Sequence, residues 1–213
     1  MQKRAAERNQ ILRDEWILKL AGWDASQLLF LDESAANERT MDRKYGWAPI
    51  GVTPHEYKSI KRSERWSILP VYTVDGFYVW DIIQGSYTKE LFNEFICTQV
   101  LPCCTPYPGP RSILVLDNAR IHHSEVLRTA FHQLTAQELE QMCLEAKIKL
   151  EYLPPYSPDY NPIEEAFAEL KAWMKKNYLL ADGYETFQGF LEAGLKHMNR
   201  KPGSHFRSCH IMM

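Results

Sequence analysis

The sequence predicts an α/β fold in which a mixed β-sheet is flanked by helices. Two apolar runs rich in β-branched and aromatic residues, 66–74 and 77–83, are separated by Asp75-Gly76, a dipeptide that favours a tight turn between antiparallel strands. After residue 84, apolar strand-like runs alternate with amphipathic segments, an order typical of parallel strands connected by helices. A hairpin followed by strand, helix and strand therefore gives a sheet with both antiparallel and parallel neighbours.

The N-terminal part of the chain predicts one helix and the first central strand. Residues 3–20 carry apolar side chains among charges on what we expect to be one side of a helix, namely Ile11, Leu12, Trp16, Leu18 and Leu20. Residues 27–32 contain a short apolar run, which favours a buried strand. Residues 33–63 are rich in charge and contain Pro49 and Pro54, so we expect irregular structure there rather than a long helix.

The middle of the chain alternates predicted helices and strands. Residues 88–101 predict an amphipathic helix whose inward side chains are Leu91, Phe92, Phe95, Ile96 and Val100. Residues 113–116 are an uninterrupted apolar run, which predicts a buried strand. Two further helices are expected, over 125–134 and, from a capping-box pattern, over 135–146. Residues 148–153 predict the last strand.

A proline-rich loop leads into the next predicted helix. Asn161 suits the N-cap position, Pro162 the first helical position and Glu164 the third. Taken alone, Glu164 also fits a capping box in which its carboxylate accepts a hydrogen bond from the Asn161 amide. Residues 184–199 predict a final amphipathic helix, and the remaining tail is expected to be short and polar.

Composition is that of an ordinary globular protein and excludes several classes. The 213 residues, 45% hydrophobic and 24% charged, fit one domain. No apolar run approaches the roughly 18 residues of a membrane span, and the N-terminus is too polar for a signal peptide, so we expect neither membrane association nor secretion. The five cysteines form no C-x-x-C pair, which argues against a zinc site and suits a reducing compartment. With a net charge of −2, DNA contacts would have to come from local basic patches or from another domain.

Three carboxylates occupy positions that favour a metal site. Asp32 and Asp117 each end an apolar run, and Glu164 lies in the first turn of a predicted helix. In α/β sheets chemistry gathers where strands end, because side chains there meet solvent on a rigid support. Such carboxylates could hold two Mg²⁺ or Mn²⁺ ions about 3.5–4 Å apart, which clamp the attacking and leaving oxygens of a phosphoryl transfer. The competing interpretation is that Asp117 only starts a turn or caps a helix.

Basic and polar residues elsewhere are candidate DNA contacts. A stretch rich in Lys and Arg with aromatic residues between them could hold a sugar-phosphate backbone. Its candidates are Arg39, Arg43, Lys44, Lys61 and Arg62. Asn118 could orient a carboxylate or touch phosphate, and His122 could contact DNA or shuttle a proton. The alternatives are a solvated loop face for the basic stretch and a structural hydrogen bond for His122.

Three motifs together are more specific than any single residue. They are Leu-Asp32-Glu-Ser, then Val-Leu-Asp117-Asn-Ala-Arg-Ile-His122, then Leu-Pro-Pro-Tyr-Ser-Pro-Asp-Tyr-Asn-Pro-Ile-Glu164. The set resembles the catalytic domain of DDE transposases, in the branch related to mariner and pogo elements and especially its fungal members. This resemblance implies an RNase H-like fold with a five-stranded mixed sheet, and metal-dependent cleavage and strand transfer of transposon DNA.

The same resemblance implies roles and partners. Asp32, Asp117 and Glu164 would be the catalytic, metal-binding triad, with two Mg²⁺ or Mn²⁺ ions. Double-stranded DNA, both transposon ends and target, would be the partner, a homodimer the candidate assembly, and the nucleus the compartment in a eukaryote, with the cytoplasm otherwise. The implied division is a helical lead-in over 1–26, a catalytic domain over 27–180, and a C-terminal helix and tail of the same domain over 181–213.

Two departures from the family pattern bear on function. The step from Asp117 to Glu164 is 164 − 117 = 47 positions, longer than is common in the family, which predicts a surface insertion near residues 125–140. About 30 residues precede Asp32, so the helix-turn-helix region that reads transposon ends is expected to be absent. The alternative is therefore a truncated or host-adopted remnant that binds DNA or protein without catalysis. A general RNase H-like nuclease is a third candidate, which the Asn-Pro-Ile-Glu motif disfavours.

Overall fold

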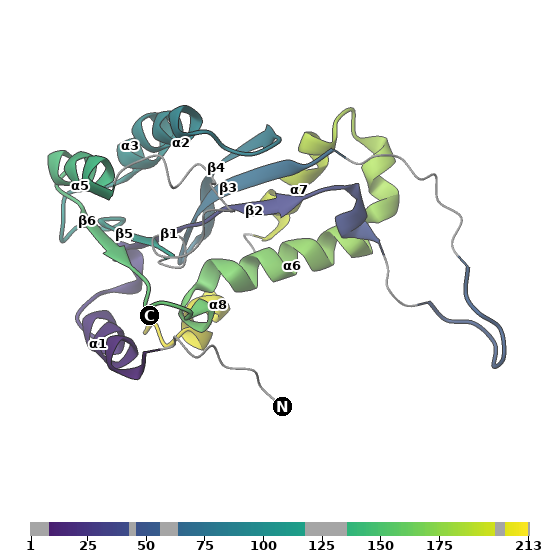
Figure 1. Cartoon of the computed structure of the whole chain (residues 1–213), viewed down its shortest axis with the longest axis horizontal. Coiled ribbons are helices and arrows are strands. Elements are labelled where there is room, and N and C mark those ends of the chain that lie inside the picture. The colour runs from purple at the N-terminus through teal and green to yellow at the C-terminus, as the bar shows by residue number, and fades with distance from the viewer. Residues whose placement is uncertain (1–8, 43–45, 56–63, 118–135, 199–202, 213) are drawn as a thin grey trace.

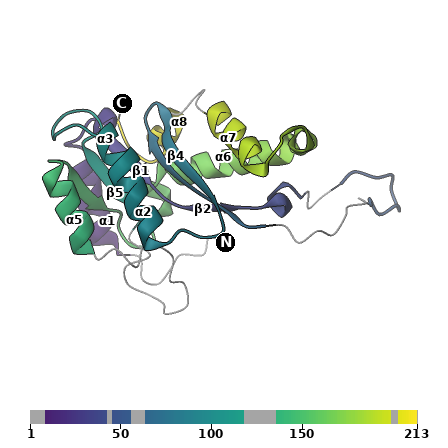
Figure 2. The same ribbon diagram turned by 90° about the horizontal axis from the view of Figure 1, so that it is seen from above.

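A computed structural model describes residues 9–42, 46–55, 64–117, 136–198 and 203–212. One β-sheet has helices on both faces (Figure 1), and Figure 2 shows the same arrangement from above. The helices are α1 (Gln10–Leu20), α2 (Lys89–Phe95), α3 (Leu101–Cys103), α5 (Ala136–Glu145), α6 (Pro162–Lys176), α7 (Phe187–Met198) and α8 (Gly203–Ser208). The strands are β1 (Leu28–Leu31), β2 (Ser34–Ala36), β3 (Trp66–Thr73), β4 (Gly76–Gln84), β5 (Ile113–Leu116) and β6 (Lys149–Tyr152).

The sheet is mixed, as the sequence predicts. Its strands follow the order β4–β3–β1–β5–β6, with β2 also paired to β3. The β3–β4 hairpin turns at Val74-Asp75, one position before the predicted Asp75-Gly76, and is antiparallel, as is the pairing of β1 with β3, whereas β1, β5 and β6 run parallel. The predicted hairpin, the strands before Asp32 and Asp117, and the helix that begins at Pro162 are thus confirmed.

The described residues form six strands where the resemblance implies five, because the first strand is interrupted. Leu31 of β1 faces Val71 of β3, and Ser34 of β2 faces Ile68 of the same strand. The register is unchanged across the gap, since three steps along β1–β2 match three steps back along β3. β2 therefore continues β1 along one edge of β3, and the expectation of irregular structure from residue 33 is wrong at 34–36.

A proline on β3 accounts for the interruption. The Gly85 amide donates to the Arg65 carbonyl over 2.7 Å, so the backbone groups of Arg65 point toward β4. Backbone groups alternate sides along an antiparallel strand, which turns those of Pro70 toward the β1–β2 side. In the shared register Pro70 faces Asp32, and proline has no N–H to donate. Pro70 therefore donates no ladder hydrogen bond at Asp32, directly after the end of β1.

Side chains of the central strands alternate between two cores. Leu28, Phe30, Ile113 and Val115 belong to the core shared with α6, α7 and α8. Leu29, Leu31, Leu114 and Leu116 belong to the core shared with α2 and α5. Both faces are covered, which explains why these strands are continuously apolar rather than alternating.

Three expectations about buried faces are wrong. In α1, Trp16 and Leu20 are buried, but Ile11, Leu12 and Leu18 are exposed, by 69%, 40% and 75%. Leu91 of α2 is also exposed. The C-terminal tail is not simply polar, because it forms α8 and buries Phe206, Cys209 and Ile211 in the core.

Some predictions lie outside the described residues. These are the helix over 125–134, most of the insertion near 125–140, and residues 3–8 of the first helix. Within the described ranges, no helix is long and apolar enough to cross a membrane.

Two glycines of α7 give a matched test of its packing against α6. An added Cβ at Gly194 would lie 2.7 Å from Leu170 Cδ1 and 3.0 Å from ring atoms of Trp173, whereas at Gly189 the nearest atom is 3.5 Å away. We expect Gly194→Ala to lower the free energy of unfolding by about 1–3 kcal/mol through overpacking. Gly189→Ala should leave it unchanged or raise it by up to about 1 kcal/mol, since alanine favours a helix. Urea denaturation measures both, and equal effects of the two substitutions would contradict the close α6–α7 contact.

Candidate active site

The register of two parallel strands brings Asp32 and Asp117 to the same edge of the sheet. Leu31 faces Leu116 in the β1–β5 pair, and each aspartate is the next residue along its strand. Neighbouring strands lie about 4.8 Å apart. Side chains two positions apart along a strand point to the same face. Asp32 is therefore on the same face as Phe30, and Asp117 on the same face as Val115, which is the face that α6 covers.

The two aspartates differ in exposure. Asp32 is 6% exposed, whereas Asp117 is half-buried. One carboxylate oxygen of Asp32, Oδ1, accepts a hydrogen bond from the Glu33 amide over 2.7 Å. This short local bond orients the Asp32 carboxylate at the point where the β-ladder is interrupted.

Glu33 lies on the opposite face of the sheet, with a second group of polar side chains. Its carboxylate is buried and lies 4.0 Å from the Arg65 guanidinium. On the same side, the Tyr87 hydroxyl donates to Asp81 over 3.1 Å. Burial raises the pKa of Tyr87, and the carboxylates of Asp81 and Glu33 raise it further. These residues therefore lie on the side of the sheet opposite Asp32, and sequence reasoning did not identify them as a group because they come from separate parts of the chain.

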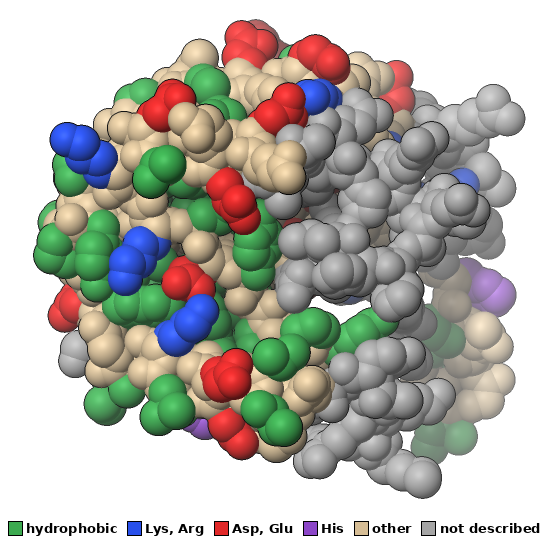
Figure 3. All heavy atoms as spheres, turned by 60° about the vertical axis from the view of Figure 1, so that its left-hand side comes forward, with side chains coloured by type: hydrophobic (Ala, Val, Ile, Leu, Met, Phe, Trp, Pro, Cys, Tyr) green, Lys and Arg blue, Asp and Glu red, His purple; other side chains and the backbone are tan. Residues whose placement is uncertain are grey.

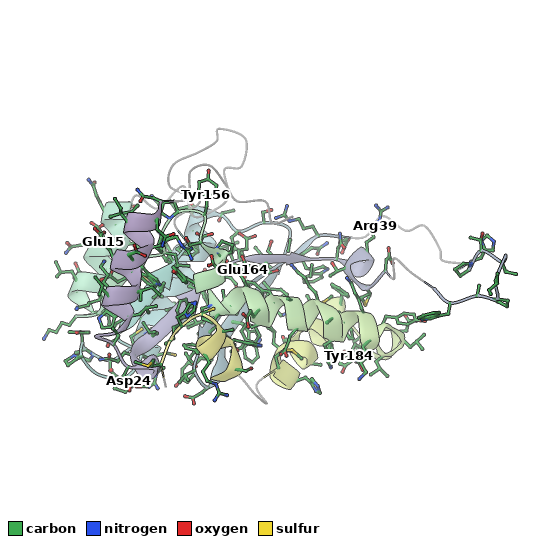
Figure 4. All side chains as sticks on the ribbon, turned by 90° about the horizontal axis from the view of Figure 1, so that it is seen from below. Glu15, Asp24, Arg39, Tyr156, Glu164 and Tyr184 are labelled. Atoms are coloured by element: carbon green, nitrogen blue, oxygen red, sulfur yellow. The ribbon has the colours of Figure 1, made fainter. Side chains whose placement is uncertain are left out.

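Glu164 approaches the site on a helix that packs against β1. The Leu153 amide donates to the Leu116 carbonyl over 2.9 Å, so the proline-rich loop starts beside the residue that precedes Asp117. The loop ends at Asn161, and α6, which contacts β1, follows. Ile163 is buried, whereas Glu164 is exposed at the start of the helix (Figure 4).

The predicted capping interactions at this helix start do not form. Asn161 makes no side-chain cap, and its buried Oδ1 has no hydrogen-bond partner. Its amide donates to the Pro158 carbonyl over 3.0 Å, so the Glu164 carboxylate does not cap it. The purely local explanation for Glu164 is therefore not supported by the geometry.

The donor set suits a hard divalent cation, but the three acids are not gathered into one cluster. Carboxylate oxygens are the ligands that Mg²⁺ and Mn²⁺ prefer. Within the part of the chain that the structure describes, no group of three His, Cys, Asp or Glu side chains is placed to hold one metal ion. The structure thus brings Asp32 and Asp117 to one edge and face, with the start of α6 on that face.

Most of the predicted DNA contacts fall outside the described residues. Arg39 is exposed in a short 3-10 turn, Glu38–Met41, that contacts α6. It lies near the end of that helix opposite Glu164 (Figure 4). Arg43, Lys44, Lys61, Arg62, Asn118 and His122 are not among the described residues. On the face drawn in Figure 3, basic and acidic side chains are interspersed.

Sequence reasoning also missed a residue of α1 that reaches the loop before Glu164. Arg13 is buried, and its guanidinium donates to both carboxylate oxygens of Asp159, over 3.1 and 2.7 Å. The Arg13 Cζ also lies 3.9 Å from the centre of the Tyr160 ring. An arginine among the apolar positions of a predicted helix was the available signal, but its partner is 146 positions away.

Several solved structures that share this fold are of a transposase. The Mos1 transposase in a paired-end complex with the left transposon end is 14% identical, with a TM-score of 0.58, and the match covers 99% of this chain and 62% of that one. The Mos1 mariner paired-end complex with Mn gives 12% identity and a TM-score of 0.60 over 99% and 60%. The Mos1 catalytic domain with Raltegravir and Mg gives 11% and 0.59 over 99% and 90%. The chain thus spans about three fifths of the transposase chains in the two complexes.

The sequence itself matches a family model over most of its length. Among curated protein sequences, no significant match was found. Residues 27–186 match the model described as DDE superfamily endonuclease, a stretch that contains Asp32, Asp117 and Glu164. With three quarters of its 213 residues inside that match, the chain belongs to the DDE superfamily of endonucleases.

Proposed function

We propose that the chain is the catalytic domain of a DNA transposase, which cleaves DNA strands and joins them to target DNA using Asp32, Asp117 and Glu164. One observation carries the proposal: the two aspartates follow register-paired residues of adjacent parallel strands, on the face against which α6 packs. Membership of an endonuclease family supports the same chemistry.

The three carboxylates would hold two divalent ions, Mg²⁺ or Mn²⁺. When bound, such ions polarise phosphoryl oxygens and activate water. Asp32, buried and oriented by the Glu33 amide, is suited to a fixed ligand, and Asp117 stands beside it. Glu164 is carried by a separate helix, so its carboxylate is the ligand whose placement depends on the loop before α6. Mos1 structures with Mn and with Mg support this choice of metals.

The expected partner is double-stranded DNA. Mos1 has been solved in complex with a left transposon end and in a strand transfer complex, which supports transposon ends and target DNA as partners for this chain. A homodimer would place two such domains on a pair of ends, and in a eukaryotic cell the reaction would take place in the nucleus.

Binding without catalysis is the second candidate. It is favoured by one observation, that the described residues include no group of three metal-ligating side chains placed around a single position. A host-adopted remnant of this kind would keep its affinity for DNA or protein while lacking cleavage. A nicking assay on variants of the acids separates this candidate from the catalytic one.

The catalytic proposal predicts metal-dependent nicking that needs the acids. With Mg²⁺ or Mn²⁺ and a labelled duplex, Asp117→Asn and Glu164→Gln should each reduce the nicking rate by at least about 100-fold, because each removes an anionic metal ligand. Asp75→Asn, an equal change of charge in the exposed β3–β4 turn, should nick like the wild type. Equal behaviour of all four proteins would support the non-catalytic remnant.

Replacing Mg²⁺ by Ca²⁺ should separate binding from chemistry. Ca²⁺ accepts the same oxygen ligands but is larger and less strict in geometry, so we expect DNA binding to persist while nicking stops. Fluorescence anisotropy measures the binding, which should weaken as salt rises, and a denaturing gel measures the nicking. Nicking in Ca²⁺ at the Mg²⁺ rate would contradict the proposed site.

A further inference from the structure

Two segments outside the family match contact the loop and helix that carry Glu164. α1 ends at Leu20, before the match begins at residue 27, and α8 begins at Gly203, after the match ends at residue 186. Each contributes polar contacts to the stretch between residues 159 and 169. The placement of Glu164 therefore depends on parts of the chain that the family pattern does not describe.

On one side, Arg13 of α1 holds the loop through a planar ion pair. Its guanidinium makes two hydrogen bonds to Asp159, over 3.1 and 2.7 Å, and lies over the Tyr160 ring. Two parallel N–H bonds fix both distance and orientation, which a single point charge cannot do. Arg13 is itself held in place, because Trp16 of the same helix is buried in the core.

On the other side, α8 holds the first two turns of α6. The Ser208 hydroxyl lies 2.6 Å from Glu165 Oε1, to which it donates. His205 Nε2 lies 3.7 Å from a Glu169 carboxylate oxygen, and its Nδ1 lies 2.6 Å from the Tyr72 hydroxyl. Glu165 and Glu169 are thus engaged by α8.

The N-cap hydrogen bond that usually fixes the start of a helix is missing from α6. A helix normally begins where an N-cap side chain satisfies its first amides, but Asn161 makes no such bond. Asp159, the partner of Arg13, lies two positions before Asn161. The Arg13–Asp159 pair is therefore a contact that can fix where α6 begins. A shift of that start by a fraction of a turn would redirect Glu164 relative to Asp32 and Asp117.

We infer that Arg13 is a positioning residue for Glu164, acting through Asp159 and Tyr160. The consequence for metal binding rests on the proposed function, whereas the consequence for the loop does not. A residue that only fastened α1 to the domain would change overall stability and leave both the loop and the metal affinity unaltered.

The experiment uses the full chain, four variants of the Arg13–Asp159 pair and one control variant. Arg13→Gln and Asp159→Asn remove one partner each, and the double variant removes both. Arg13→Lys keeps the positive charge but loses the bidentate guanidinium. Lys19→Gln is the matched control, because Lys19 of the same helix pairs with Glu151 on β6 over 2.7 Å rather than with the loop. Hydrogen exchange of residues 157–164 and calorimetric titration with Mn²⁺ are the readouts.

We expect faster exchange at residues 157–164 and about tenfold weaker Mn²⁺ binding in both single variants, as for groups that orient metal ligands. The double variant should match Arg13→Gln within about twofold, since both changes break one interaction. Arg13→Lys should resemble Arg13→Gln, because bidentate geometry is lost, and Lys19→Gln should resemble the wild type.

Two results would overturn the inference. The first is unchanged exchange at 157–164 in Arg13→Gln, whether or not the protein is less stable overall. The second is an equal effect of Lys19→Gln. If the wild type binds no Mn²⁺ and nicks no DNA, the proposed function fails, and the exchange data alone then decide whether Arg13 fixes the loop.

Discussion

The parallel pairing of β1 with β5 is the constraint on which the rest of this molecule depends. With Leu31 opposite Leu116, the residues that follow are both aspartates, and they leave the sheet side by side. Parallel neighbours cannot be joined by a short turn, so the chain between them must cross over, and the hairpin and α2 occupy that connection. Because helices then cover both faces, the central strands are apolar throughout.

The proposed site combines a rigid half with a half that is placed separately. Asp32 and Asp117 directly follow β1 and β5, whose register brings them to the same edge of the sheet. Glu164 belongs to a helix whose start is set by contacts from both ends of the chain, with Arg13 on one side and Ser208 on the other. Three carboxylates brought together repel one another unless a cation offsets their charge, which gives a physical reason for a site in which one acid is positioned independently of the other two.

Local patterns were enough to predict most of the elements but not their contacts. Asp75-Gly76 between apolar runs gave the hairpin, and Asn161-Pro162 gave the start of α6. The continuation of β1 as β2 could not be predicted, because it depends on the partner strand, and Ser34–Ala36 has no strand pattern of its own. Arg13 is buried because it pairs with Asp159, and Phe206 is buried because α8 packs against the sheet. Both are tertiary contacts between residues far apart in the sequence, so a short stretch of sequence does not reveal them. The sites of Asn118 and His122 remain predictions from the sequence.

Pro70 has a consequence for anyone transplanting or searching for this kind of centre. It faces Asp32 from 70 − 32 = 38 positions further along the chain. Because proline has no amide hydrogen, it cannot donate a ladder hydrogen bond to the strand beside the acid. A graft that copied only the acidic side chains onto another scaffold would omit this proline. Any other residue at the position opposite the aspartate has an N–H, which could extend the β-ladder past the aspartate. In this chain the proposed centre thus includes an imino acid on the adjoining strand, which a motif drawn around the aspartate alone omits.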